Sequence, residues 1–435
     1  MIFFAKILLD MFEFVSYAQS TVGLFPDTVQ YFSCSFMSVR CSVIMSPEEL
    51  YEQILSAVSR GNLKAARQQL AEYKFTGSSR QVDIDLNNLL REAIHSDQNQ
   101  IVELLVEFGA DVGREDADGK RAIHIAAECD NVIALKLINR SGTALNVVDR
   151  NGSSALHIAL ICGHRNSSLF LIEAGATVNR PRRYDSGEAP VHIAARLGDS
   201  IIMAAVLSRG VGRPDVQSSD GTTPLHIAAR ERHAGCVDLL CMAAVHRETV
   251  NTVDKSRLTP LHGAVNSSAL DVVRILLRHG ANPNAVDRDG LAPLHYAAAA
   301  AHPPVFSHSA VVDLLIAHGA NVSIRDNQCR TPLHLAAAVG NAALVRLLLL
   351  AGADIDAVER ILGETAVNIA AAYGRYDAMV ELCEASCDVN IADKHGVAPL
   401  YKLLSSAGNG EQYDRGSHRC VRLLASLSVR TGSCR

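Results

Sequence analysis

Histidines and cysteines are the residues of this chain whose numbers suggest chemistry. The 435-residue sequence contains 17 histidines and 11 cysteines, and both side chains can bind zinc or act in catalysis. Seven histidines occupy one position of a recurring segment, which reads Thr331-Pro332-Leu333-His334 in its clearest copy. These seven are His124, His157, His192, His226, His262, His295 and His334. A zinc site or a general base would need such groups to converge on one atom.

The even spacing of these histidines predicts a row of rings rather than a convergent site. Two further copies of the segment carry Asn368 and Tyr401 at the same position. Neither residue replaces imidazole as a base or as a typical zinc ligand. We therefore expect the seven histidines to have a structural role without a metal.

The cysteines allow two interpretations, a disulfide framework or reduced thiols. Their number is odd, the chain is long, and their spacing follows the recurring segments, which favours reduced thiols. Cys383 and Cys387 are four residues apart, and Cys236 and Cys241 are five apart, but no Cys-x-x-Cys pair with zinc spacing occurs. We expect small buried hydrophobic side chains rather than a metal site.

Other catalytic patterns are missing from the sequence. It contains no G-x-S-x-G, H-E-x-x-H or phosphate-binding P-loop motif. The acidic pair Glu48/Glu49 stands at a predicted helix start, and Asp287/Asp289 stands in a predicted turn, so capping and turn roles are expected for them. The prediction is a protein that is not an enzyme, with no catalytic residues, no cofactor and no metal.

The recurring segment predicts a pair of short helices. Thr331 is a suitable N-cap whose hydroxyl can bond to the backbone, and Pro332 suits the first helical position. Gly340 interrupts the apolar pattern, a second helix is predicted from Ala343 to Leu350, and Gly352 follows its end. Helices this short are not stable alone in water, so each pair needs neighbours.

Neighbours are present because the segment recurs nine times, at intervals of about 33 to 39 residues. The copies begin at Arg121, Ser154, Ala189, Thr223, Thr259, Ala292, Thr331, Thr365 and Ala398. This period with a T-P-L-H core resembles the ankyrin repeat. The resemblance implies an all-α repeat solenoid of stacked helix-turn-helix units with β-hairpin fingers.

The chain divides into an extension and a solenoid in this reading. Residues 45–435 form the solenoid, with degenerate capping repeats at 45–110 and clear repeats at 116–430. Residues 1–44 lack the repeat pattern, and charged residues interrupt their apolar run, so they are expected to be poorly structured or non-native rather than a signal or anchor. A hydrophobic content of 48% suits a continuous core, and no membrane insertion of the repeats is expected.

Turn signals mark the fingers that join the repeats. Asp-x-x-Gly occurs at Asp116/Gly119, Asp149/Gly152, Asp287/Gly290 and Asp393/Gly396, where Asp can brace the turn and Gly can take positive φ. Arg257 and Cys329 replace the glycine in two fingers. The basic run Arg180–Arg183 lengthens a third finger. This finger is either solvated or contacts phosphate or an acidic peptide. Insertions at 301–308 and 409–416 are expected to be loops.

The family resemblance implies a function in binding other proteins through the concave face of fingers and first helices. The prediction is a cytoplasmic adaptor or scaffold, including the substrate-recognition part of a ubiquitin ligase. The alternative is a truncated cytoplasmic ankyrin arm of a membrane channel or of a multidomain enzyme, which the uncovered last helix favours. The net charge of −5 gives no indication of nucleic-acid binding, and no oligomeric state is predicted.

The repeat alignment places a candidate partner-binding surface on the middle repeats. It consists of Arg196, Arg230, Lys255, Leu258, Arg288, Leu291 and Arg330. Cations beside exposed aliphatic side chains suit an extended acidic segment with hydrophobic anchors. The other interpretation is an ordinary solvated surface, because nearby acidic residues can neutralise the cations.

One asparagine resembles a modification site. Leu382, Asp388, Val389 and Asn390 resemble the pattern at which ankyrin-repeat asparagines are hydroxylated. The resemblance therefore implies hydroxylation of Asn390.

Overall fold

The computed structural model describes residues 47–77, 85–142, 144–182, 186–208, 212–243, 247–300, 305–407, 421–422 and 424–426. These residues belong to two compact units, which divide between Asp111 and Val112. The N-terminal extension, the insertion at 409–416 and residues 301–304 of the 301–308 insertion lie outside the described residues. The domain boundaries predicted from the sequence therefore stay predictions.

The first unit contains two helical pairs. Its helices are α3 (Pro47–Ser59), α4 (Leu63–Gly77), α5 (Leu86–His95) and α6 (Asn99–Glu107). Asp85 caps α5 because its side chain accepts from the backbone N–H groups of Asn87 and Asn88. Asn88 donates from its amide to the Tyr51 hydroxyl at 2.7 Å, which ties α5 to α3.

The second unit repeats a pair of helices along the chain, as the sequence predicts. We call the first member of each pair a first helix. The first helices are α7 (Ala122–Glu128), α9 (Ala155–Ile161), α11 (Pro190–Leu197), α13 (Pro224–Arg230), α15 (Pro260–Asn266), α17 (Pro293–Ala299), α19 (Pro332–Val339), α21 (Ala366–Ala372) and α23 (Pro399–Ala407). All nine begin one residue after the predicted repeat starts.

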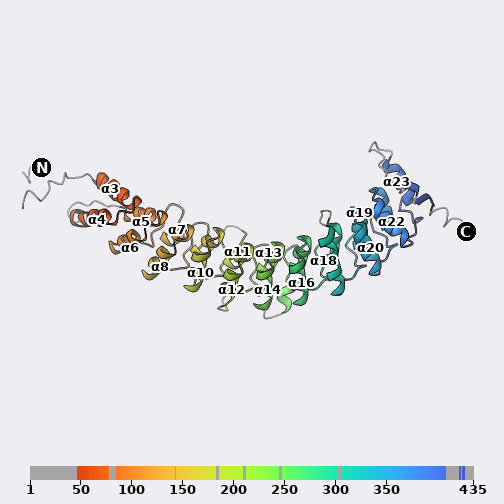
Figure 1. Cartoon of the computed structure of the whole chain (residues 1–435), viewed down its shortest axis with the longest axis horizontal. Coiled ribbons are helices and arrows are strands. Elements are labelled where there is room, and N and C mark those ends of the chain that lie inside the picture. The colour runs from red at the N-terminus through yellow and green to blue at the C-terminus, as the bar shows by residue number, and fades with distance from the viewer. Residues whose placement is uncertain are drawn as a thin grey trace, which may run out of the picture. The chain divides into compact units, whose positions relative to one another are not determined.

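The second helices form a separate layer. They are α8 (Val132–Arg140), α10 (Arg165–Glu173), α12 (Ser200–Ser208), α14 (Ala234–Ala243), α16 (Leu270–Arg278), α18 (Val305–Ala317), α20 (Ala342–Leu350) and α22 (Tyr376–Glu384). A short 3-10 helix, η1 (Arg247–Asn251), follows α14. Within the second unit, first helices such as α11 and α13 line one side and second helices such as α12 and α14 line the other (Figure 1). The all-α repeat solenoid is confirmed.

Small and aliphatic side chains fill the space between the layers. Leu333, Ala336 and Ala337 of α19 are fully buried, as are Val345 and Leu348 of α20. First helices pack on the first helices of neighbouring repeats, for example α13 on α15 and α17 on α19. Alanine at two adjacent positions allows this close approach, so the core runs through the unit without large aromatic residues.

The start of α19 differs from the prediction in one detail. The Thr331 hydroxyl was expected to cap α19 through the backbone, but it lies 2.9 Å from Nδ1 of His334. The backbone N–H of Thr331 also donates to this ring nitrogen, at 3.0 Å. The ring therefore takes over the capping function, which explains why Ala189 and Ala292 occupy the same position without a hydroxyl.

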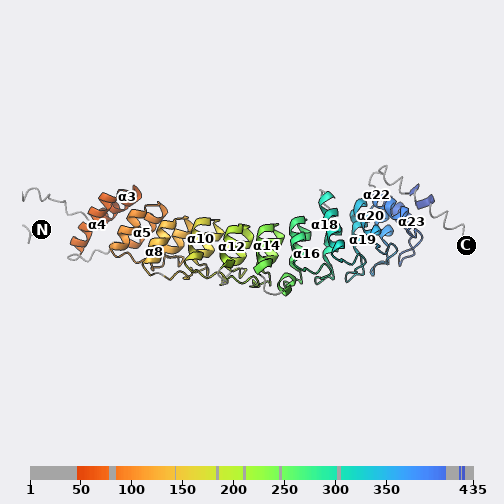
Figure 2. The ribbon, with the colours of Figure 1, turned by 60° about the horizontal axis from the view of Figure 1, so that its bottom comes forward.

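The fingers are tight turns rather than regular hairpins. Among the described residues, pairing typical of a strand is limited to one isolated bridge, between Val148 and Ser154. Each turn is closed locally instead: the Asp287 N–H donates to the Leu291 carbonyl, and Oδ1 of Asp287 accepts from the N–H groups of Asp289 and Leu291. The expected bracing by Asp is thus confirmed. Figure 2 shows the segments between repeats along one edge of the second unit.

The insertion after α17 also differs from the prediction. Residues 301–308 were expected to form a loop because of Pro303 and Pro304, but α18 already begins at Val305. It has 13 residues, whereas α16 and α20 have nine each. A proline is tolerated ahead of a helix because the first N–H groups have no partner within the helix. Part of the insertion therefore lengthens the second helix.

Candidate functional site

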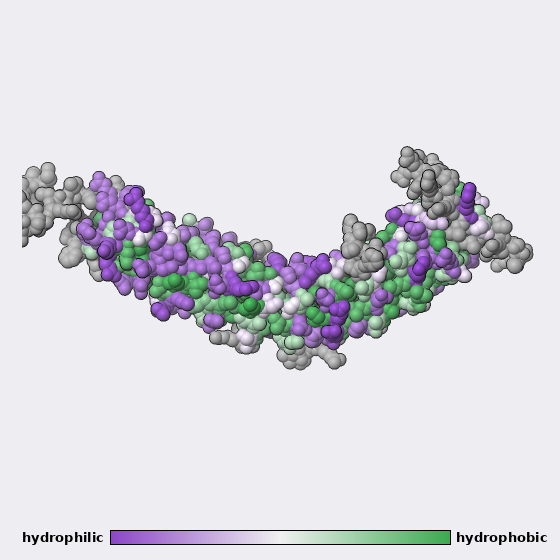
Figure 3. Space-filling view, viewed as in Figure 1, coloured by the Kyte–Doolittle hydropathy of each residue, from purple (hydrophilic) through white to green (hydrophobic). Residues whose placement is uncertain are grey.

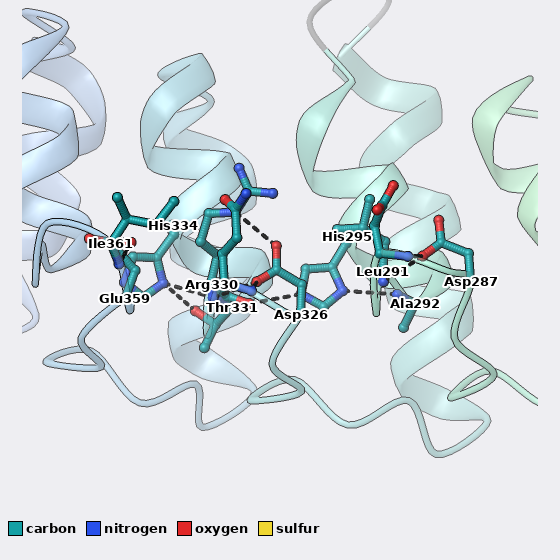
Figure 4. A network of polar contacts seen from close by, with 12 residues as sticks. Asp287, Leu291, Ala292, His295, Asp326, Arg330, Thr331, His334, Glu359 and Ile361 are labelled. Atoms are coloured by element: carbon teal, nitrogen blue, oxygen red, sulfur yellow. Dashed lines mark hydrogen bonds and ion pairs between the residues drawn. The ribbon is translucent and has the colours of Figure 1, made fainter.

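The histidines link each first helix to the next repeat. In each of the seven, Nδ1 accepts from the backbone N–H of the residue before the helix, at 3.0 Å for His295 and 3.2 Å for His226. Nε2 then donates to a carbonyl of the following repeat, as from His295 to Arg330 at 3.1 Å and from His334 to Glu364 at 3.2 Å. Figure 4 shows this arrangement for His295 and His334, together with the finger residues Asp287, Asp326 and Glu359.

Both ring nitrogens are therefore used, and the rings are held neutral. Because Nδ1 accepts a hydrogen bond, the proton lies on Nε2. Burial lowers the pKa of all seven imidazoles, since the charged form loses its hydration. At His157 the nearby charge of Arg182 adds to burial, and the pKa falls to about 4.

The repeat of α21 lacks a complete link. Asn368 replaces histidine in α21 and donates to the Ile391 carbonyl at 3.1 Å, as Nε2 of a histidine does elsewhere. Its Oδ1 and the Thr365 hydroxyl oxygen are both buried without a hydrogen-bond partner among the described residues. The shorter amide reaches the next repeat but does not cap its own helix.

We expect Asn368→His to raise the stability of the second unit by about 1 kcal/mol, the net contribution of one recovered hydrogen bond. Urea unfolding followed by circular dichroism measures the change. His226→Asn is the matched control and should lower stability by a similar amount. A destabilised Asn368→His protein would mean that the imidazole does not fit between α21 and the residues that follow it.

A second series of links was missed by the sequence analysis. Asparagines three residues before a finger bridge to the next repeat: Oδ1 of Asn251 accepts from the Asn282 N–H at 2.7 Å, and Oδ1 of Asn284 accepts from the Asn321 N–H at 2.7 Å. Asn146 and Asn179 accept likewise from Thr177 and Arg213. Their fixed offset from the finger was a sequence signal that could have revealed this role.

The finger tips are also joined to one another. The Lys255 N–H donates to the Asp220 carbonyl at 2.9 Å, and the Arg288 N–H donates to the Ser256 carbonyl at 3.1 Å. The Asn327 N–H donates to the Asp289 carbonyl at 3.0 Å. Neighbouring fingers are thus held at fixed spacing, so side chains at their tips form a continuous, preorganised surface.

The finger tips and the exposed ends of the first helices together form a surface that we call the first-helix face. Of the five predicted cations on it, Arg196 pairs with Glu188, and Arg330 pairs with Asp326 at 2.8 Å. Arg230 lies 3.4 Å from Glu231. Lys255 and Arg288 are exposed, and no carboxylate of the described residues forms an ion pair with either.

The two predicted leucines are half-buried rather than exposed, which corrects the sequence interpretation. Leu258 is fixed because its N–H donates to Asp254 and its carbonyl accepts from His226 of the preceding repeat. Leu291 is held in the same way by Asp287 and His262. In Figure 3 the upper edge of the second unit near its middle is mostly hydrophilic.

Exposed apolar side chains lie elsewhere on the first-helix face. Ile161 is 54% exposed at the end of α9, and Leu197 is 37% exposed at the end of α11. Arg196 directly precedes Leu197. For Ile161 the sequence signal was an apolar residue at the position where neighbouring repeats carry Glu128, Arg196 and Arg230.

The predicted hydroxylation residue is accessible. Asn390 is exposed, and its N–H donates to Oδ1 of Asp388 at 2.9 Å, while Leu382 and Val389 are buried. The basic run at Arg180 is partly engaged, because the Arg180 guanidinium donates to the Asn146 carbonyl at 3.2 Å. Arg183 lies outside the described residues.

Within the described part of the chain, no group of three or more His, Cys, Asp or Glu side chains is placed to hold a metal ion. The same residues include no helix long and apolar enough to cross a bilayer. What the arrangement supplies is a row of linked repeats with a polar, partly charged surface.

The family is decided by a comparison with family models. The model described as ankyrin repeats (3 copies) matches residues 89–182, 180–252, 245–326, 284–359 and 333–431. The chain belongs to the ankyrin-repeat family. Ankyrin repeats are in general non-enzymatic protein-interaction modules, so this ankyrin-repeat chain is a protein-binding module.

Several larger proteins resemble it over part of their length. The E3 ubiquitin-protein ligase KEG of Arabidopsis thaliana is 27% identical over 349 residues, which are 78% of this chain and 19% of that protein. Rabankyrin-5 of Homo sapiens is 26% identical over 183 residues, 42% of this chain and 13% of that protein. Alpha-latroinsectotoxin-Lt1a of Latrodectus tredecimguttatus is 42% identical over 72 residues, 17% of this chain and 5% of the toxin. The ankyrin-repeat chain spans less than a fifth of each.

Proposed function

We propose that this chain is a cytoplasmic adaptor or scaffold that binds an extended acidic segment of another protein on the first-helix face. The observation that carries the proposal is the pair of exposed, unpaired cations Lys255 and Arg288 on fingers that are joined by backbone hydrogen bonds. A surface fixed in this way loses little entropy when a partner binds.

The hydrophobic part of the partner contacts Ile161 and Leu197. These side chains lie at the ends of neighbouring first helices, which pack on each other. They take the anchoring role that the sequence assigned to Leu258 and Leu291, since half-buried side chains offer little surface for a partner. The cations mainly speed association, whereas the apolar contacts slow dissociation.

The similarity to the ligase KEG supports a finer version of the proposal. In that version the bound segment belongs to a protein that the chain presents to a ubiquitin ligase. Asn390 is in addition a substrate for hydroxylation, as its resemblance to the modified asparagines implies. Intact-mass analysis after incubation with an ankyrin-directed asparagine hydroxylase tests this point, and a mass without an added oxygen contradicts it.

Two pairs of substitutions test the binding surface. Arg230→Glu with Arg288→Glu should weaken binding of an acidic partner segment about tenfold, mainly through slower association at low salt. Ile161→Ser with Leu197→Ser should weaken it about tenfold through faster dissociation. Surface plasmon resonance against partners captured by the unchanged protein separates the two rate constants.

The control reverses two charges on the second helices, Lys136→Glu in α8 and Arg278→Glu in α16. Both side chains are exposed, so this variant changes the net charge by the same amount without touching the first-helix face. Each variant should keep the melting curve of the parent. If the control weakens binding as much as the first pair, the effect is one of net charge and the proposed surface is wrong.

A further inference from the structure

Two cysteines replace residues that are aliphatic in the neighbouring repeats. At the end of α16 the corresponding pair is Leu277 and Ala281, and at the end of α20 it is Leu349 and Ala353. In the repeat of α22 both positions are cysteine, Cys383 and Cys387. Packing alone does not require two thiols at positions that leucine and alanine fill next door.

The end of α22 brings the two side chains together. The helix stops at Glu384, and Ser386 adopts a left-handed conformation with φ of 68°. The Ser386 N–H then donates to the Cys383 carbonyl at 3.0 Å, and the Cys387 N–H donates to the Leu382 carbonyl at 3.2 Å. This reversal places Cys387 beside the last turn of the helix, close enough to Cys383 for each thiol to shift the pKa of the other.

Accessibility distinguishes this pair from the other closely spaced cysteines. Cys383 and Cys387 are each partly exposed, whereas Cys236 and Cys241 are buried, with 0% and 5% of their surface exposed. A small reagent can therefore reach the first pair without unfolding. The neighbouring Cys387 thiol lowers the pKa of the Cys383 thiol, while burial raises the pKa of both Cys236 and Cys241, that of Cys241 to about 12.

We propose that Cys383 and Cys387 form a redox-active dithiol that small-molecule disulfides convert to an intramolecular disulfide. The Cys383 thiolate attacks one sulfur of oxidised glutathione, which forms a mixed disulfide and releases one glutathione thiolate. Cys387 then loses its proton and attacks the Cys383 sulfur, which closes the protein disulfide and releases the second glutathione. The dithiol is oxidised, and one glutathione disulfide is reduced to two thiols.

The proposal does not depend on the proposed binding function, because α22 is a second helix outside the first-helix face. Closing the disulfide ties Cys387 to the last turn of α22 and fixes the segment that leads to Asp388 and Asn390. The site therefore gives this repeat two covalent states with different local mobility.

Mass spectrometry of one tryptic peptide tests the proposal. Cleavage after Arg375 and Lys394 yields a peptide that contains both cysteines and no other cysteine. The native full chain is treated with oxidised glutathione and then unfolded in denaturant, free thiols are alkylated, and the protein is digested. The expected peptide is lighter than the reduced, unalkylated form by two hydrogen atoms, while the peptides that carry Cys236 and Cys241 are alkylated.

Two variants complete the test. Cys387→Ala, which installs the residue of the neighbouring repeats, should leave a stable glutathione adduct on Cys383 because the second thiol is missing. In Cys383→Leu, Cys387 should carry no glutathione and should therefore be alkylated. In the treated parent protein, alkylation of both Cys383 and Cys387 overturns the proposal, as does a glutathione adduct that persists on either of them. Oxidation of Cys236 and Cys241 to the same extent as Cys383 and Cys387 also overturns it.

Discussion

Mild acid is expected to unfold the second unit well before its carboxylates are protonated. Seven buried histidines have a pKa below the ordinary value of 6.5, so the unfolded chain binds protons that the folded chain does not. Their contribution to stability is complete above about pH 6.5 and is lost as the pH falls from there through the folded-state values. Each histidine contributes about 1.4 kcal/mol per pH unit within that window.

The summed effect is large if the repeats unfold together. The losses at the seven histidines then add, and repeats that unfold separately show proportionally less. Urea midpoints measured by circular dichroism at pH 7, 6 and 5 test this prediction. Finger carboxylates such as Asp393, whose pKa is held at about 2 mainly by Lys402, act only at lower pH.

A matched pair of variants assigns the acid sensitivity to this series. His226→Asn removes one titrating ring. It should therefore reduce the number of protons taken up on unfolding by about one, and with it the pH dependence of the free energy of unfolding. His318→Gln, which removes an exposed histidine outside the series, is the matched control. A stability that is flat between pH 7 and pH 5 would show that the histidines are not held neutral by the fold.

The second large effect is expected at the base of a finger. Asp287 is buried, and its carboxylate accepts from the N–H groups of Asp289 and Leu291 and from the Tyr296 hydroxyl at 2.7 Å. Asp287→Ala leaves these three donors without their acceptor and should cost about 3 kcal/mol. Thermal unfolding of the purified variant measures the loss.

Tyr296→Phe is the control for this prediction. It removes one of the three hydrogen bonds and keeps the turn, so it should cost about 1 kcal/mol. Burial and the bond to Asp287 raise the pKa of the Tyr296 phenol, so it stays a neutral donor throughout the measured range. Equal losses for the two variants would mean that the turn itself contributes little.

Local sequence was sufficient to predict where the first helices begin. A residue such as Thr331 followed by Pro332 and Leu333 restricts the backbone within a few positions, so all nine starts are at the predicted residues. The row of histidines was also predicted, because side chains that recur at one position of successive repeats do not converge on one metal ion.

What the sequence could not supply depends on contacts between repeats. From the sequence, Leu258 is expected to be exposed beside its turn. Its carbonyl accepts a hydrogen bond from His226 of the preceding repeat, and this contact keeps Leu258 half-buried. Asn251 looks like a loop residue, yet it bridges to Asn282. The start of α18 at Val305 was likewise not predicted, and this helix packs against α16 and α20.

The central claim, binding on the first-helix face, is tested most directly by photo-crosslinking from single positions. A photoreactive amino acid replaces Lys255 on a finger in one variant and Arg278 at the end of α16 in the other. Both side chains are exposed, but only Lys255 lies on the proposed surface. Our account predicts crosslinked partner peptides rich in Asp and Glu from position 255 and none from position 278. Partner peptides that crosslink at position 278 and not at position 255 would contradict it.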